Sequence, residues 1–318
     1  MLRSLLLNLS KSPWAKRQIA SFWVAKRVVR RFVAGEKPED ALRAIGELNA
    51  RGIVTTVDHL GESVSDADEA VRSAEAYFDI LDRMARAQVR SNASLKLSQL
   101  GLNLSLDLCA ANLRKVLERA RGLGLFVRID MEDSPVVDRT LEVYRRMRSA
   151  GFDNTGVVIQ AYLYRSEKDV AELLKSNTRF RLCKGAYKEP ASVAFPSKRD
   201  VDANFFKLGT MMLDAAAEAR LPADPRGIVP PIPALATHDE KLVRVLLAYA
   251  EARKIPKSLY EFQMLHGIRR DLQEELASQG YGVRVYVPYG LEWYPYFMRR
   301  LAERPANLWF FVANFFRA

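Results

Sequence analysis

The stretch RVYVPYGLEWYPYFMRRLAER, Arg284–Arg304, predicts a short strand that runs into a helix. Together with the preceding Val283, its first residues alternate valines with an arginine and a tyrosine, which is the period of a strand. Pro288 and Gly290 are expected to break the strand, and Leu291–Glu303 is expected to form an amphipathic helix. The rest of the chain repeats this unit of strand, loop and helix.

Seven earlier apolar runs also have the length of strands, and amphipathic patterns of helical period separate them. The eight expected strands are Gly52–Asp58, Ala93–Ser98, Leu125–Asp130, Gly156–Ala161, Phe180–Lys184, Ala234–Thr237, Tyr260–Met264 and Val283–Val287. The expected helices between them are Asp68–Arg90, Leu106–Arg121, Val136–Ala150, Glu167–Lys175, Val201–Arg220, Glu240–Arg253 and Arg269–Gln279. Ser105, Ser166 and Asp239 precede three of these helices and are expected to cap them.

Regular alternation of strands and helices predicts an α/β fold with a parallel sheet, and eight units predict a closed (βα)8 barrel of the TIM type. The alternative is an open doubly wound sheet, which usually has a glycine-rich turn after its first strand. The first turn here is DHLGE, Asp58–Glu62, and neither GxGxxG nor GxxxxGK[ST] occurs in the chain. A length of 318 residues, 49% of them hydrophobic, suits one large barrel domain.

Positive charge is concentrated at the N-terminus, where residues 1–35 hold eight lysines and arginines and no acidic residue. The other 41 basic and 38 acidic residues contribute only +3 of the net charge of +11, which disfavours nucleic acid as a partner. We therefore divide the chain into a basic amphipathic helical arm, residues 1–45, and a barrel domain, residues 46–318. The apolar tail Ala306–Phe316 is expected to pack on the barrel or at an interface.

Two interpretations of the arm stay open. A basic amphipathic helix with tryptophans can lie peripherally on an anionic membrane surface, whereas the same helix can pack on its own domain or at a contact between subunits of a homo-oligomer. An acid-free, arginine-rich start also resembles a mitochondrial transit peptide. No apolar run reaches the roughly 18 residues that span a bilayer, so we expect no integral membrane segment.

The two cysteines, Cys109 and Cys183, lie far apart in apolar contexts, and no CxxC pair occurs. No disulfide framework and no zinc site are therefore indicated, and no metal is expected. A reducing, cytoplasmic compartment fits, with peripheral attachment to an inner membrane as the open addition. The short chain without a clear cleavage site favours a bacterial protein over a mitochondrial one.

Polar residues gather at the C-terminal ends of the expected strands, where barrels have their active sites. They are Asp58, His59, Glu62, Lys96, Asp130, Gln160, the run RLCKGAY from Arg181 to Tyr187, Thr237, His238, Gln263, Leu265 and Tyr286. Each alone has a structural explanation: Asp130 and His238 can belong to helix caps, and Gln160 can satisfy backbone groups. Lys96 points away from the leucines beside it and needs a carboxylate such as Asp130. Together these residues indicate a positive, hydrogen-bonding ring at one mouth of the barrel.

Arg299 and Arg300 are adjacent on the last helix and point about 100° apart. Two guanidiniums that converge from different directions suit a small carboxylate, because each can grip it through two N–H groups. A solvated helix face is the alternative, but neighbouring aromatic residues imply a desolvated helix. In RLCKGAY, Arg181 and Lys184 flank a Gly-Ala turn that can grip a diphosphate and let the backbone approach a flat ring.

Several strings, in family order, resemble the motifs of the proline dehydrogenase family in its stand-alone bacterial form. They are DHLGE, SLKLSQLG, RIDMED, QAYLYRS, RLCKGAY, ATHDE, EFQMLHG and RVYVPYG with WYPYFMRRLAER. The resemblance covers the chain after the basic arm and implies a distorted (βα)8 barrel whose last helix covers the active site. It implies FAD bound without a dinucleotide fingerprint. It also implies oxidation of L-proline to 1-pyrroline-5-carboxylate, the first step of proline catabolism, with hydride passing from the ring carbon beside nitrogen to FAD and electrons then to quinone.

The same resemblance implies roles for single residues. The proline carboxylate binds Arg299, Arg300 and Lys96, and Asp130 beside Lys96 sets its orientation and charge. Tyr286 and Leu265 pack on the pyrrolidine ring, while Glu62 pairs with the first arginine and closes the site. The residues expected at FAD are Gln160, Arg181, Cys183, Lys184, Gly185, Ala186, Tyr187, Thr237, His238 and Gln263. Lys188 and Glu189 depart from the family pattern, because many relatives carry tryptophan there, and Leu291 stands where relatives often have a polar residue.

Two other functions stay open. One is a barrel aldolase or isomerase that uses Lys184 or Lys96 as a Schiff-base amine. The other is a non-enzymatic basic scaffold at a membrane or on RNA, which the near-neutral body of the chain disfavours. Whether FMN partly replaces FAD also stays open.

Overall fold

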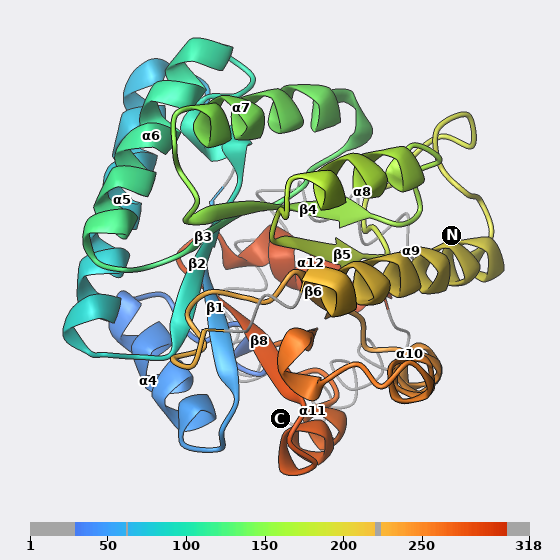
Figure 1. Cartoon of the computed structure of the whole chain (residues 1–318). Helices are drawn as coiled ribbons and strands as arrows, with labels where there is room; N and C mark the ends of the chain where they lie inside the picture. Colours follow the sequence, from blue (N-terminus) through green and yellow to red (C-terminus); the bar gives the residue numbers. More distant parts are fainter. Residues whose placement is uncertain (1–28, 62, 220–223, 304–318) are drawn as a thin grey trace, which may run out of the picture.

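A computed structural model describes residues 29–61, 63–219 and 224–303 and shows a ring of strands surrounded by helices (Figure 1). Eight parallel strands pair in chain order, and β8 pairs with β1 to close the barrel. The strands are β1 (Val54–His59), β2 (Ser91–Leu95), β3 (Val127–Ile129), β4 (Thr155–Gln160), β5 (Phe180–Cys183), β6 (Pro233–Ala236), β7 (Glu261–Leu265) and β8 (Gly282–Tyr289). The predicted closed barrel is confirmed, and the open doubly wound sheet is excluded.

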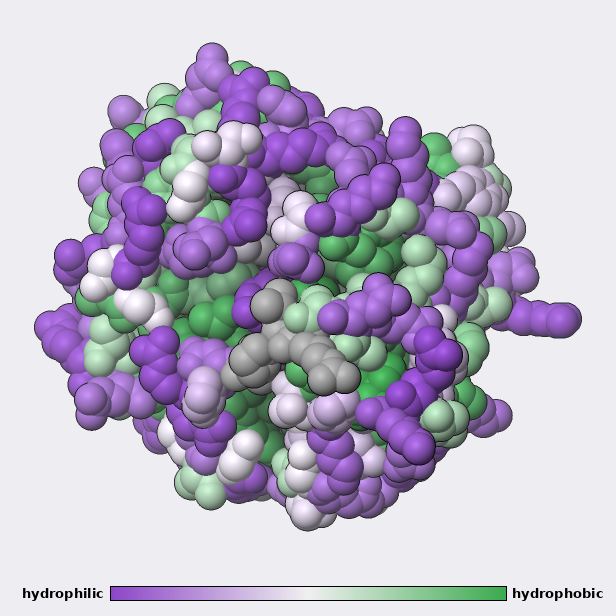
Figure 2. All heavy atoms as spheres, in the orientation of Figure 1, coloured by the Kyte–Doolittle hydropathy of each residue, from purple (hydrophilic) through white to green (hydrophobic). Residues whose placement is uncertain are grey.

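The helices lie outside the ring, except for the last. They are α4 (Pro38–Asn49), α5 (Ala67–Arg86), α6 (Leu106–Gly122), α7 (Val137–Ser149), α8 (Ser166–Lys175), α9 (Lys198–Ala219), α10 (Glu240–Ala252), α11 (Arg270–Ser278) and α12 (Trp293–Glu303), with short 3-10 turns η1 (Leu97–Leu100), η2 (Ser134–Val136) and η3 (Lys257–Leu259). Figure 2, in the same orientation, shows that hydrophilic side chains dominate the surface turned toward the viewer. Among the described residues, no helix is both long and apolar enough to cross a bilayer.

Two of the three predicted helix caps are confirmed. The Ser105 hydroxyl accepts hydrogen bonds from the first backbone N–H groups of α6, and the Asp239 carboxylate accepts one from Lys241 N–H at the start of α10. The prediction for Ser166 was wrong. Ser166 is the first residue of α8, and its hydroxyl donates to the carbonyl oxygens of Gln160 and Leu163, so it fastens the turn after β4 instead.

Pro288 does not break the last strand, contrary to the prediction. It lies within β8 and is paired in register with Asp58 of β1. On the other side, the ladder with β7 ends at Tyr286, whose carbonyl accepts from His266 N–H. Because the ladder with β7 has already ended, the missing backbone N–H of Pro288 destabilises the sheet little at this point. The second strand ends at Leu95, three residues before the predicted end, so Lys96 directly follows the strand as the N-cap of η1.

The amino-terminal end of the barrel interior is filled by a buried polar group. Arg284, 1% exposed, donates to both carboxylate oxygens of Glu261 at 2.7 and 3.1 Å and to the side-chain oxygen of Asn92 at 2.8 Å. Such a charge is tolerated because it is paired and hydrogen-bonded. This plug leaves the carboxyl ends of the strands as the place for a site.

Helix α12 lies across the ring of strands rather than outside it (Figure 1). Its apolar face belongs to a second hydrophobic cluster, separate from the main core, which also contains Leu60 after β1 and Ile268 after β7. The remaining members come from the segment before α4: Val29, Phe32 and Val33. The end of the basic arm thus helps to seat the last helix.

Candidate active site

A cavity of about 690 Å³ lies at the carboxyl ends of the strands, with α12 as one wall. It is lined by every described residue that was expected to contact proline or FAD: Lys96, Asp130, Gln160, Arg181, Cys183, Lys184, Gly185, Ala186, Tyr187, Thr237, His238, Gln263, Leu265, Tyr286, Arg299 and Arg300. His59, which was also expected at this mouth, does not line the cavity; its ring centre lies 5.1 Å from that of Tyr289. Glu62 lies outside the described residues, as do residues 1–28 of the arm and the apolar tail. Residues as far apart in the chain as Asp58 and Arg300, 242 positions, meet here because every strand ends at the same mouth and α12 lies over it.

Lys96 is held chiefly by Asp58, not by Asp130 as the sequence suggested. Its ammonium nitrogen lies 3.1 and 3.2 Å from the two carboxylate oxygens of Asp58 and 3.8 Å from Asp130 Oδ2. Burial by itself lowers the pKa of Lys96, but the two carboxylates outweigh burial and raise it above the ordinary value. Lys96 is therefore a fixed cation at neutral pH.

Asp130 serves other partners. Its carboxylate accepts hydrogen bonds from the Tyr286 hydroxyl at 2.6 Å, from the Ser94 hydroxyl at 2.6 Å and from the Arg181 guanidinium. Burial favours the neutral acid, yet these partners together with Lys96 hold the pKa of Asp130 below its usual value. Burial, reinforced by the Asp130 charge, raises the pKa of Tyr286 well above the ordinary value. The carboxylate thus fixes the phenol ring in its neutral form, and the Arg181 guanidinium lies 5.3 Å from the centre of that ring.

Two cations enter the cavity from α12. Arg299 is partly exposed and lines the cavity, whereas Arg300 is only 8% exposed and lies 5.1 Å from the ring centre of Tyr296. An arginine this buried does not belong to a solvated helix face, so that alternative is excluded for Arg300. Leu265 lines the same cavity and packs against the apolar cluster under α12.

On the side of β4 and β5 the cavity offers a place for a flat, polar group. The side-chain oxygen of Gln160 is buried and has no hydrogen-bond partner among the described residues, which makes it an acceptor ready for a ligand N–H. Gly185 has φ +109°, and a β-carbon there would collide with the ring of Tyr162. The residues present therefore fit the hydrogen-bonding edge of a ring system such as a flavin.

Lys184 stands at the outer part of this side in a ring of charges. Its ammonium binds Asp202 at 2.5 Å and Asp239 at 3.0 Å, and Lys198 pairs with the same two carboxylates. Burial alone would raise the pKa of Asp239, but the two lysines lower it to about 2. His238 next to it accepts a hydrogen bond from Leu265 N–H through Nε2 at 2.8 Å, so its ring is fixed to the end of β7. Two other residues expected at FAD also have defined surroundings. The side-chain amide of Gln263 donates a hydrogen bond to the Glu261 carboxylate at 2.6 Å. Burial raises the pKa of the Cys183 thiol to about 11.

Glu189, which departs from the family pattern, fastens the loop after β5. Its carboxylate accepts hydrogen bonds from the backbone N–H of Ser134 at 2.8 Å, from the Ser134 hydroxyl and from the Tyr162 hydroxyl at 3.3 Å. Glu132 does the same one loop earlier, accepting from Ser98 N–H at 3.0 Å and from the Ser98 hydroxyl at 2.6 Å. These carboxylates tie together loops that follow different strands at this mouth of the barrel.

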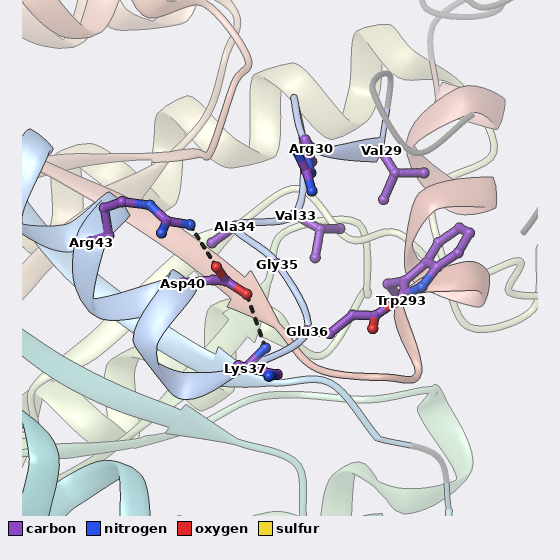
Figure 3. Close-up of a pocket in the computed structure, with 10 residues that line it drawn as sticks. All are labelled: Val29, Arg30, Val33, Ala34, Gly35, Glu36, Lys37, Asp40, Arg43 and Trp293. Carbon is purple, nitrogen blue, oxygen red and sulfur yellow. Dashed lines mark hydrogen bonds and ion pairs between the residues drawn. The ribbon is translucent and has the colours of Figure 1, made fainter. Parts of the chain in front are cut away.

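A second cavity, of about 610 Å³, lies where the end of the arm meets α4 and α12 (Figure 3). Val29 and Val33 face Trp293 across it, and the Asp40 carboxylate accepts from Arg43 at 2.5 Å and from Lys37 N–H at 3.3 Å. Ala34 N–H donates to Pro288 O, and Gly290 N–H donates to Gly35 O. The segment before α4 is therefore bonded to the β8–α12 connection as well as packed on it.

Several lining residues had no role at the site assigned from the sequence: Met131, Lys198, Asp239, Glu240, Arg269, Tyr296 and Asp58, which was expected at this mouth but given no partner. That Asp58 points into the barrel follows from strand period alone. In VTTVDH it shares a face with Thr56, whose hydroxyl donates inside the barrel to Asn92 at 2.7 Å. The direction of Asp58 was therefore readable, but its pairing with Lys96 depends on how β1 and β2 meet.

The chain matches the family model for proline dehydrogenase over residues 41–312. It is 40% identical over 307 residues to proline dehydrogenase 1 of Bacillus subtilis strain 168, covering 96% of both chains. It is 39% identical over 289 residues to proline dehydrogenase of Deinococcus radiodurans, covering 90% of this chain and 89% of that one. Among solved structures, proline utilization A (PutA) of Bdellovibrio bacteriovorus inactivated by N-propargylglycine superposes with a TM-score of 0.77 at 27% identity, covering 88% of this chain and 33% of that longer chain.

Proposed function

Because the chain belongs to the proline dehydrogenase family and oxidises proline in the first step of proline catabolism, we propose that the cavity under α12 holds L-proline against FAD. The family is generally flavin-dependent, and the product would be 1-pyrroline-5-carboxylate. The observation that carries the proposal is the meeting of three cations, Lys96, Arg299 and Arg300, with Leu265 and Tyr286 in one cavity.

The three cations suit the carboxylate of an amino acid. A carboxylate has about four lone-pair directions, and guanidinium and ammonium groups from different elements can occupy several of them together. Charge-assisted hydrogen bonds of this kind contribute roughly 1.5–3 kcal/mol each. The clamp fixes one end of the substrate and leaves the ring to be placed by the apolar wall.

Tyr286 and Leu265 supply that wall. The Tyr286 ring is held by its hydrogen bond to Asp130 and by the Arg181 guanidinium beside it, so it cannot easily swing away from a bound ring. A hydroxyl group on the pyrrolidine would have to be accommodated against this fixed ring. Tyr286 therefore favours proline over ring-hydroxylated analogues by shape.

FAD would be held by the residues along β4, β5, β6 and β7: Gln160, Arg181, Cys183, Lys184, Gly185, Ala186, Tyr187, Thr237, His238 and Gln263. The unpaired oxygen of Gln160, buried in the wall of this cavity, supports this proposal. The bound flavin supplies a hydride acceptor. The protein's part is to orient the proline carbon beside nitrogen toward it, with the amine neutral, and to exclude water under α12.

The electrons would leave to a membrane quinone. The basic arm, residues 1–45, would bring the enzyme to the surface of an anionic inner membrane from the cytoplasmic side, with assembly into a homo-oligomer as the other use of the arm. We propose Glu62 as the residue that closes the site over Arg299.

A Schiff-base mechanism is disfavoured by the surroundings of both lysines. An amine nucleophile needs a depressed pKa, whereas Lys96 has a raised pKa between two carboxylates and Lys184 is bound by two others.

The decisive test of the proposed function is a visible spectrum of the purified protein followed by proline-dependent bleaching under anaerobic conditions. A flavin band that bleaches supports the proposal. A colourless protein that stays colourless after addition of FAD, or that forms a borohydride-trapped adduct with a carbonyl substrate, refutes it.

A further inference from the structure

We infer that Asp58 is the positioning residue for the substrate carboxylate: it holds Lys96 charged and aimed into the cavity, which leaves Asp130 to serve Tyr286 and Arg181. The inference rests on the proposed role of Lys96 at the proline carboxylate. It divides the two buried carboxylates at this mouth of the barrel between two tasks.

The geometry separates the two tasks. Both oxygens of Asp58 lie within 3.2 Å of the Lys96 ammonium, whereas Asp130 is 3.8 Å away. Asp130 already accepts from Ser94, Arg181 and Tyr286. Asp58 is 0% exposed, and among the hydrogen bonds of the described residues its side chain has Lys96 alone as partner.

The placement follows from the barrel. Asp58 is the fifth residue of the six-residue β1 and pairs in register with Ser94 of β2, two residues before Lys96. Its side chain therefore reaches across to the point where β2 ends and η1 begins. Lys96 has extended backbone there, φ −108° and ψ 134°, so its direction continues the inward face that Ser94 also occupies.

The titratable groups that face Lys96 come from three elements: Asp58 and His59 of β1, Asp130 after β3, and Tyr187 after β5. Burial lowers the pKa of His59 below 6.5 and raises that of Tyr187 to about 12, so neither titrates between pH 7 and 9.5. Arg181 and Tyr286 face Asp130, and Arg299 faces Tyr187. In this window a change in carboxylate affinity would report Lys96.

The sign of the effect follows from the forces on Lys96. Burial is the largest influence on its pKa and lowers it, and the Asp58 charge is the largest opposing one. In Asp58→Asn the side chain keeps its shape and a hydrogen-bonding oxygen but loses its charge. The pKa of Lys96 then falls, so the ammonium is lost at a lower pH than in the wild type, and with it one charge-assisted hydrogen bond to the substrate.

The test is the affinity of the holoenzyme for tetrahydrofuran-2-carboxylate, measured by calorimetry between pH 7 and 9.5. This analogue of proline has oxygen in place of the amine, so it does not titrate in the window. We expect the wild-type dissociation constant to stay flat and that of Asp58→Asn to rise about tenfold, the worth of one such bond. In the Lys96→Met background, adding Asp58→Asn should leave no pH-dependent loss.

The outcomes separate the inference from its premise. If Lys96→Met binds the analogue as tightly as wild type, the proposed role of Lys96 fails, and the inference with it. If Lys96→Met weakens binding but Asp58→Asn stays flat with pH, the inference alone is overturned. Asp82→Asn, which removes a carboxylate paired with Arg119 on the outer helices at 2.7 Å, is the matched control and should behave as wild type. A pH-dependent loss of affinity that persists in the Lys96→Met background would also overturn the inference.

Discussion

The ring centres of Phe32, in the segment before α4, and Phe297, in α12, lie 6.2 Å apart. Both are buried, at 1% and 0% exposure, in the cluster that is separate from the main core. The helix that carries Arg299 and Arg300 is thus seated on residues that precede the barrel by sequence. This contact joins the end of the arm to the substrate site.

Phe32→Ala should therefore raise the KM for proline several-fold and lower the melting temperature. Removing a buried phenylalanine costs about 3–5 kcal/mol, and the loss falls on the packing of α12. The check is steady-state kinetics with an artificial dye together with thermal unfolding. Phe205→Ala, an equally buried position on α9 within the main core, should lower the melting temperature without raising KM; equal effects on KM would contradict the link.

Arg299→Met should raise the KM for proline roughly ten- to a hundred-fold while the protein stays yellow, because one charge-assisted clamp bond is lost and the expected flavin contacts are not. Proline kinetics and the flavin spectrum measure the two effects separately. Arg119→Met on the outer surface should change neither. Wild-type kinetics in Arg299→Met would remove this arginine from the clamp.

Tyr286→Ser should raise activity on 4-hydroxyproline relative to proline, because the smaller side chain makes room for a ring hydroxyl. Tyr286→Phe keeps the ring but removes the hydroxyl that donates to Asp130 at 2.6 Å, so it should not shift the preference toward 4-hydroxyproline. The ratio of kcat/KM for the two substrates is the measurement. A steric role is refuted when the serine variant shows the wild-type ratio or when phenylalanine produces the same shift.

Deleting residues 1–28 should leave dye-linked proline oxidation intact and reduce association with anionic liposomes. The deletion should stop before Val29, since Val29, Phe32 and Val33 pack under α12 and Ala34 bonds to Pro288. Co-sedimentation with liposomes and the dye assay test the two properties. Unchanged sedimentation would mean that the arm is structural.

The barrel was predictable because strand and helix periods are set by local stereochemistry and burial. The eight apolar runs and the amphipathic segments between them needed no knowledge of tertiary contacts, and every described residue expected at proline or FAD does line one cavity. The errors lay where the neighbouring element decides. Pro288 stays in β8 because β7 has already ended beside it. Ser166 faces the turn after β4 instead of the first N–H groups of its helix.

The sequence by itself determined the repeating units, the closed barrel and the kinds of charged groups at its mouth, since these follow from side-chain period and from the rule that strand ends converge. Only the tertiary structure decided which charges pair. Asp58 rather than Asp130 is nearest to Lys96, and Phe32 lies under Arg299's helix. The physical reason is that pairing between elements depends on the stagger of adjacent strands and on the packing of α12, and neither is encoded in any single stretch of residues.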